Sequence, residues 1–190
     1  DVDAVRLGIG SDDRIGKRFL FAGIGYGGSC FPKDVTALSN TAEANDYDFK
    51  IVKAVTDVNE RQKQTIINKT KAYYDGQLKG KKFELWGLDF KPDTDDIREA
   101  PSLTIIDELI KAGAEVVAYD PEATDNVRKR YADQSALSFA DDMYKALDGA
   151  DALLIATEWS EFRTPDYAKI KQALKAPVIL TGATCTIWIL

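Results

Sequence analysis

Residues 82–88, Lys-Phe-Glu-Leu-Trp-Gly-Leu, decide the fold, because they are typical of a strand that ends at a glycine and leads into a charged loop. Beyond them, apolar strands alternate with helical segments. The expected strands are 82–88, 115–120, 136–139, 152–156 and 177–180, and the expected helices are 101–112, 125–131, 143–147 and 167–174. This alternation favours right-handed βαβ units on a parallel sheet, with ligands at the carboxyl ends of the strands. We therefore predict an α/β protein with a Rossmann-like parallel-sheet domain over residues 79–190.

The residues before this domain have a helical pattern. Between Val35 and about Tyr74 there is no Gly or Pro, and Asn45-Asp46-Tyr47-Asp48 is expected to divide the stretch into two helices. The second helix, from about residue 49 to 74, would be roughly 40 Å long. In a small protein such a helix packs against a partner element or a second subunit. The fold class is thus an α/β protein with a long helical dimerisation segment before the sheet.

Composition excludes several classes of function. The chain has 190 residues, a net charge of −6 and 45% apolar residues, which argues against a nucleic-acid partner. No apolar run reaches the ~18 residues of a membrane span. Two cysteines give no disulfide framework, which fits a cytoplasmic location. The absence of histidine removes Ser-His-Asp and Cys-His catalysis and the usual metal sites, so no metal is predicted and any general base is Asp, Glu, Lys or a thiolate.

The stretch Gly25-Tyr26-Gly27-Gly28-Ser29-Cys30-Phe31-Pro32-Lys33-Asp34 is the first candidate site. Glycines let the backbone approach a ligand, and Lys33 with the amide groups of the following helix favours a thiolate. Asp34 follows Cys30 by one helical turn. The alternative is a glycine-rich turn with a buried structural cysteine. The stretch also contains Gly23-x-Gly25-x-x-Gly28, but we reject a dinucleotide fingerprint because no βαβ unit surrounds it and Pro32 interrupts the helix.

The second candidate site is the loop from Leu88 to Ser102, which follows the first predicted strand. A doubly wound sheet places ligands at this position. Lys91 and Arg98 are cations well suited to phosphate groups, and several acidic residues lie between them. The alternative is a solvated charged loop without a ligand.

Taken together, four motifs resemble the UDP-glucose 6-dehydrogenases of the UDP-glucose/GDP-mannose dehydrogenase family. They are Arg14-Ile15-Gly16 with Phe19-Leu20, the stretch 25–35, Val58-Asn59-Glu60-Arg61-Gln62-Lys63, and the loop 87–98. The resemblance runs in order from residue 1 to about 180. It implies a central helical and dimerisation region with the catalytic cysteine over residues 1–78, and a UDP-binding Rossmann-like domain over residues 79–190.

The resemblance also implies a reaction and a set of site residues. Members of this family oxidise UDP-glucose to UDP-glucuronate, a precursor for polysaccharide biosynthesis, by two hydride transfers to NAD through a Cys thiohemiacetal and thioester. By resemblance Cys30 is the nucleophile, Asp34 assists hydrolysis, and Lys33 and Arg98 approach NAD. The expected substrate-binding residues are Arg14, Phe19, Leu20, Phe21, Ala22, Gly23, Gly27, Phe90 and Lys91. Arg14 is expected to reach a neighbouring subunit's substrate in a homodimer formed through the long helix near Val58.

Two departures from the family pattern produce further expectations. The N-terminal NAD-binding domain of the family has no counterpart, so the chain alone is expected to lack dehydrogenase activity. After residue 180 the family pattern is Asp-Gly-Arg-Asn-Leu-Tyr, whereas Thr181 to Leu190 read Thr-Gly-Ala-Thr-Cys-Thr-Ile-Trp-Ile-Leu. A one-nucleotide frameshift would restore that pattern, and sequencing the coding DNA tests this hypothesis. The open alternatives are a GDP-mannose 6-dehydrogenase relative and a non-catalytic UDP-sugar-binding dimer module.

Overall fold

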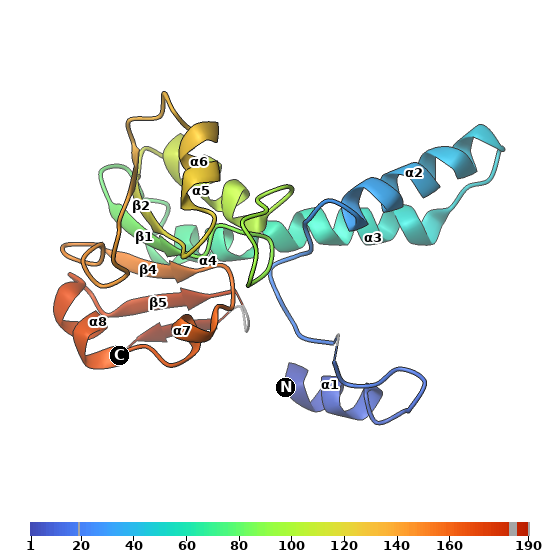
Figure 1. Ribbon diagram of the computed structural model, residues 1–190, viewed down its shortest axis with the longest axis horizontal. Coiled ribbons are helices and arrows are strands. Elements are labelled where there is room, and N and C mark those ends of the chain that lie inside the picture. Colours follow the sequence, from blue (N-terminus) through green and yellow to red (C-terminus); the bar gives the residue numbers. More distant parts are fainter. Residues whose placement is uncertain (19, 183–185, 190) are drawn as a thin grey trace.

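The computed structural model describes residues 1–18, 20–182 and 186–189. A twisted sheet covered by helices lies at one end of the molecule (Figure 1). Within these residues the strand order is β3-β2-β1-β4-β5-β6. The first five strands are parallel, and β6 pairs with β5 in the antiparallel sense. The strands are β1 (Lys82–Trp86), β2 (Glu115–Tyr119), β3 (Leu137–Phe139), β4 (Ala152–Ile155), β5 (Val178–Thr181) and β6 (Thr186–Ile189). The predicted parallel α/β sheet is confirmed.

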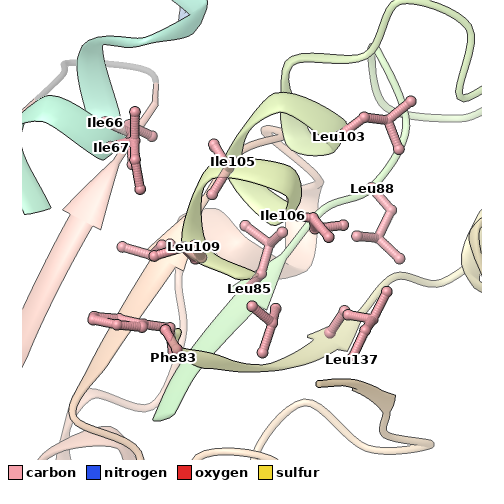
Figure 2. Close-up of a cluster of buried hydrophobic side chains, with 14 of the residues drawn as sticks. Ile66, Ile67, Phe83, Leu85, Leu88, Leu103, Ile105, Ile106, Leu109 and Leu137 are labelled. Carbon is pink, nitrogen blue, oxygen red and sulfur yellow. The ribbon is translucent and has the colours of Figure 1, made fainter. Parts of the chain in front are cut away.

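The central strand β1 is buried on both faces, because its side chains alternate between two apolar clusters. Phe83 and Leu85 point to one face, where Figure 2 shows them beneath the helix that carries Ile106 and Leu109. Trp86 points to the opposite face and belongs to the second cluster. Burying a side chain of this size contributes about 1.5–3 kcal/mol, so β1 anchors both layers of the fold.

Helices cover the two faces of the sheet. α5 (Pro101–Lys111) and α6 (Thr124–Arg130) pack on one face, and α7 (Ser160–Arg163) and α8 (Tyr167–Ala173) contribute to the cluster on the other (Figure 1). α5 begins with a proline. Proline suits the first helical turn, because the backbone N–H groups of that turn have no partner within the helix and proline therefore loses no hydrogen bond there. The strand order reverses direction between β1 and β4, so ligand-binding loops are expected at the carboxyl ends of these two strands.

Before the sheet, the described residues form four helices: α1 (Val2–Ile9), α2 (Phe31–Ala44), α3 (Lys50–Lys63) and α4 (Thr65–Tyr73). α2 and α3 run back to back as a hairpin that projects away from the sheet (Figure 1). α4 continues from α3 toward the sheet, and its Ile66 and Ile67 are buried in the main core (Figure 2). In the part of the chain described here, no helix combines the length and the apolar character that crossing a membrane requires.

The predicted single helix over residues 49–74 is wrong in one respect, because α3 and α4 meet at Gln64. The Gln64 N–H donates to the Arg61 carbonyl, three residues back, at 3.2 Å. This tighter turn replaces the usual bond to the fourth residue back and separates the two helices. Gln64 is no glycine or proline, so the residue type gave no sign of the break.

One further local prediction is wrong, and two short elements were not predicted. Residues 143–147 form turns instead of a helix, with the Leu147 N–H donating to the Tyr144 carbonyl three residues back. The short helix α7 was not predicted, because four residues are too few to show a helical period. The edge strand β6 was not predicted either. It lies within residues 181–190, where no strand was expected.

Candidate active site

Cys30 lies at the N-terminus of α2, immediately before the first helical residue, Phe31. The expected helix start at Val35 is wrong, because Pro32 stands in the first turn of the helix, where proline needs no N–H partner. The thiol is exposed, and its Sγ lies 3.7 Å from the Ser29 Oγ in a hydrogen bond. A helix N-terminus carries partial positive charge, so an anionic group bound beside Cys30 would be stabilised there.

The first turn of α2, directly after Cys30, carries two charged side chains. The Asp34 N–H donates to the Cys30 carbonyl at 2.8 Å, which places Asp34 one helical turn after Cys30, as the spacing predicts. The Lys33 Nζ lies 3.4 Å from Asp34 Oδ1, and both side chains are exposed. The first turn of the helix after Cys30 therefore carries an exposed carboxylate paired with an exposed ammonium group.

The glycine-rich turn packs directly against the second candidate loop. A Cβ on Gly27 would overlap the Glu99 carbonyl oxygen, and a Cβ on Gly28 would lie 2.7 Å from Phe90 Cε2. The Gly28 N–H donates to the Arg98 carbonyl at 2.7 Å. Gly28 also has a φ of +90°, which side chains rarely adopt. The two glycines are thus required for contact between the two motifs.

Gly27→Ala is expected to destabilise the protein by about 1–3 kcal/mol, because the added methyl group meets backbone that cannot move aside cheaply. Gly23→Ala is the matched control, since a Cβ at Gly23 meets nothing within 4 Å. The measurement is the free energy of unfolding in urea for both variants. Equal losses of stability in the two variants would show that close packing is not the reason for a glycine at position 27.

The second loop presents two cations beside this turn. Lys91 is exposed, with its Nζ 5.4 Å from the centre of the Phe90 ring. Arg98 donates to both carboxylate oxygens of Asp96, at 2.9 and 2.7 Å. Those bonds raise the pKa of Arg98, and the nearby Cys30 adds a smaller contribution. Lys91 and Arg98 thus place two exposed cations on this loop.

Three pockets surround the junction of the two motifs. One, of about 590 Å³, is lined by Ser29, Lys33 and Arg98. A smaller one, of about 100 Å³, lies at the carboxyl ends of β1 and β4 and is lined by Phe90 and Lys91. A third, of about 680 Å³, is largely apolar and lies along α3; its lining includes Phe21, Ala22, Gly23, Val55 and Val58. The first of these pockets is lined by Ser29, the residue before Cys30, and by three cations, Lys33, Lys63 and Arg98.

The remaining expected site residues lie on the segment that leads to Cys30. Leu20, Phe21, Ala22 and Gly23 are in an extended stretch between α1 and α2. Phe21 is 65% exposed, and the Arg6 guanidinium lies 4.7 Å from the centre of its ring. Phe19 lies outside the described residues.

Arg14 lies in the loop after α1 and donates to both carboxylate oxygens of Asp12, at 2.9 and 2.6 Å. Its side chain is 88% exposed. Within the described residues, no contact joins Arg14 to Cys30. In Figure 1, α1 and the loop after it lie apart from the start of α2. The structure therefore brings together the two motifs but leaves Arg14 on a separate part of the surface.

A polar row on α3 was missed as part of the site. Asn59, Gln62 and Lys63 share one helix face, and all three bond to the segments that carry the two motifs. Asn59 and Lys63 are nearly buried. The signal that could have found them is their spacing of three and four residues, because polar residues on one buried helix face require partners.

Asp89, at the start of the second loop, was also missed. It is 1% exposed, and its Oδ2 accepts a hydrogen bond from Trp159 Nε1 at 2.8 Å. Its Oδ1 is buried and has no hydrogen-bond partner among the residues that the structure describes. Burial raises the pKa of Asp89 to about 7, and the neighbouring Asp120 carboxylate contributes to the increase. Asp120 itself accepts from the Leu88 N–H at 2.7 Å, so two buried carboxyl groups flank the root of the loop.

Two family models match this chain. Residues 84–186 match the model described as "UDP-glucose/GDP-mannose dehydrogenase family, UDP binding domain", and residues 1–61 match the model for the central domain of the same family. The match over residues 84–186 covers more than half of the chain.

Relatives and solved structures agree with these matches. The chain is 46% identical to a UDP-glucose 6-dehydrogenase of Pseudomonas aeruginosa over 96% of its length and 41% of that relative. It is 44% identical to the Rhizobium meliloti UDP-glucose 6-dehydrogenase over 95% of its length and 40% of that relative. A UDP-glucose dehydrogenase structure from Pyrobaculum islandicum superimposes with a TM-score of 0.84 at 32% identity, over 96% of this chain and 40% of that one. The chain thus spans about two fifths of the relatives it matches, and it belongs to the UDP-glucose/GDP-mannose dehydrogenase family.

Proposed function

We propose that this chain forms the thiol-bearing and UDP-sugar-binding part of an NAD-dependent UDP-glucose 6-dehydrogenase. The observation that carries the proposal is the junction of the two motifs, in which Phe90 packs on the glycine turn and Gly28 bonds to Arg98. This junction supports a single site that holds a UDP-sugar on the Lys91 side and its reacting carbon at Cys30. In the proposal, residues 1–78 form the central helical region and residues 79–190 the UDP-binding domain.

The chemistry of this site follows from the thiol. The first oxidation removes a hydride and a proton from the C6 alcohol of the sugar and gives an aldehyde. The Cys30 thiolate then adds to the aldehyde carbon, forming a C–S bond and an alkoxide. Collapse of the alkoxide expels the second hydride and leaves a thioester. Water, deprotonated with the help of Asp34, adds to the thioester, and cleavage of the C–S bond releases the carboxylate and restores the thiolate.

The residues beside Cys30 fit a dinucleotide cofactor. Two molecules of NAD⁺, bound one after the other, would each accept one hydride. Lys33 and Arg98 line the same pocket as Ser29, and their positive charge suits the negative charge of a pyrophosphate. We assign these two side chains to cofactor binding, and Phe90, Lys91, Gly27 and the segment 19–23 to the UDP-sugar.

A homodimer through α3 is part of the proposal. Ile51, Val55 and Val58 are 73%, 44% and 53% exposed on this helix, and Phe21 adds to the same apolar pocket. An exposed apolar face of this kind supports a protein interface. In such a dimer Arg14 would contribute to the partner's substrate site.

Lys91→Ala is expected to weaken UDP-glucose binding by about 10- to 100-fold, because one charge-assisted hydrogen bond contributes about 1.5–3 kcal/mol. Isothermal titration calorimetry of UDP-glucose with this chain measures the change. Lys171→Ala, which removes an exposed lysine on α8, is the matched control and is expected to bind like the parent chain. An unchanged dissociation constant for Lys91→Ala would contradict the placement of the diphosphate.

The same titration separates the two nucleotide classes. We expect UDP to compete with UDP-glucose and GDP to compete poorly, as a UDP-binding domain requires. Tighter binding of GDP would favour a GDP-mannose 6-dehydrogenase.

Dehydrogenase activity is tested after joining the chain to the part of a full-length relative that it does not cover. UDP-sugar binding without NADH formation in that protein would favour a non-catalytic binding module.

A further inference from the structure

One face of α3 holds the glycine-rich turn in place through its side chains. The Tyr26 N–H donates to Asn59 Oδ1 at 2.7 Å, and the Asn59 Nδ2 donates back to the Tyr26 carbonyl at 3.1 Å. The carboxamide thus satisfies both backbone groups of one residue, as a neighbouring strand would. Asn59 is 6% exposed, so these bonds form where little water competes.

Two further contacts extend this attachment along the same helix face. The Gln62 Nε2 donates to the Gly23 carbonyl at 2.7 Å. The Lys63 Nζ lies 3.2 Å from Glu99 Oε2, on the loop that carries Arg98. Residues 59, 62 and 63 therefore connect the segment before Cys30 and the second loop to one rigid helix.

The backbone of the turn is shaped to accept Asn59. Gly25 has a φ of +107°, and a Cβ there would lie 2.9 Å from Asn59 Oδ1. The bonds to Tyr26 lie four residues before the thiol, and the Gly28 bond to Arg98 lies two residues before it. The contacts from α3 thus hold the turn on one side while the second loop holds it on the other.

We propose that Asn59 is a positioning residue that sets the place of the Cys30 turn relative to the loop 91–98. This proposal rests on the proposed function, in which the UDP group binds at Lys91 and the sugar carbon must meet the thiol. Loss of the Asn59 bonds leaves the nucleotide contacts in place but lets the turn shift. A shift of about 1 Å at a reacting centre costs up to about 100-fold in rate.

The test compares Asn59→Ala, Asn59→Asp and Asn40→Asp. The aspartate at 59 keeps the acceptor for the Tyr26 N–H but places a carboxylate oxygen against the Tyr26 carbonyl. Asn40→Asp is the matched control, since Asn40 lines the same pocket from α2 and makes none of the hydrogen bonds that join α3 to residues 23–28. It introduces the same charge near the site without touching the turn. Thermal unfolding of all three variants confirms that they fold.

The first readout is amide hydrogen exchange at Tyr26, measured by NMR in this chain. We expect exchange at least about tenfold faster in Asn59→Ala, an intermediate change in Asn59→Asp and no change in Asn40→Asp. The second readout is steady-state kinetics in the protein joined to the rest of a relative. We expect kcat to fall about 10- to 100-fold in Asn59→Ala with KM within about threefold of the parent value.

Each outcome decides the proposal. Faster exchange at Tyr26 with an unchanged kcat would overturn it, as would unchanged exchange at Tyr26. If kcat/KM falls in Asn59→Ala only because KM rises, Asn59 acts in substrate binding and not in positioning. If the parent protein forms no NADH, the proposed function fails, whereas the exchange data still test the contacts to the turn.

Discussion

Cys30→Ala is expected to lower the steady-state rate of UDP-glucuronate formation by at least about 10⁴-fold in the protein joined to the rest of a relative, because loss of a nucleophile costs on this order. The stoichiometry is a sharper readout than the rate. The alcohol becomes an aldehyde without any thiol, but an aldehyde carbon carries no alkoxide from which a hydride can leave. The variant is therefore expected to stop at one NADH for each UDP-glucose, whereas the parent protein forms two.

Cys185→Ala is the matched control, because it removes the other cysteine of the chain. It is expected to form two NADH for each UDP-glucose at the parent rate. Mass spectrometry adds an independent readout: the thioester is expected on the peptide that contains Cys30 in the parent protein. Two equivalents of NADH from Cys30→Ala, at a rate within about tenfold of the parent, would place the nucleophile elsewhere.

Much of the fold could be predicted from the sequence, because it depends on strong periodic patterns. The run 82–88 marks a buried strand and the apolar residues of 101–112 mark a helix beside it, so the parallel sheet was predictable. The break at Gln64 was not, since it depends on how α4 tilts to bury Ile66 and Ile67 in the core. Tertiary packing decided that boundary, and local residue preference did not.

The candidate site shows the same division. Cys30 and Lys91 are identifiable from residue type, because thiols and cations beside glycine turns have specific chemistry. The contact between their two loops was not readable, because it depends on Gly27 and Gly28 leaving room for Phe90 and Glu99. The helix start at Phe31 was missed because a proline in the sequence has two opposite meanings. Pro32 could interrupt a helix or stand in its first turn. Only the three-dimensional arrangement decides between these two meanings.

Asp89 is expected to make the free energy of unfolding depend strongly on pH. Its carboxyl group is buried beside Asp120, with one oxygen bonded to Trp159 and the other without a partner among the described residues. The charged form is therefore disfavoured in the folded state, and the pKa is raised from 3.8 to about 7. A raised carboxyl pKa means that the folded state holds this proton more tightly than the unfolded state. Stability from this group is then present at low pH and is lost as the pH rises toward 7.

Asp89→Asn is expected to remove this loss, because the amide stays neutral and its oxygen still accepts from Trp159 Nε1. Between pH 5 and pH 8 the parent protein is expected to lose about 2–3 kcal/mol at this position, which follows from a pKa of about 7. The free energy of unfolding of the variant, relative to the parent, should therefore improve by that amount between the two pH values. Urea unfolding at pH 5, 6, 7 and 8 measures the difference.

The comparison between two pH values makes this prediction independent of how well the amide packs. Any steric or hydrogen-bonding cost of the amide in Asp89→Asn is the same at pH 5 and pH 8, so it cancels in the difference. Asp93→Asn makes the same chemical change in the same loop at an exposed position and is expected to leave the pH dependence unaltered. Parallel pH profiles for Asp89→Asn and the parent would mean that Asp89 is already ionised at pH 5. The burial beside Asp120 would then be relieved by water or by movement of the Phe90–Lys91 loop.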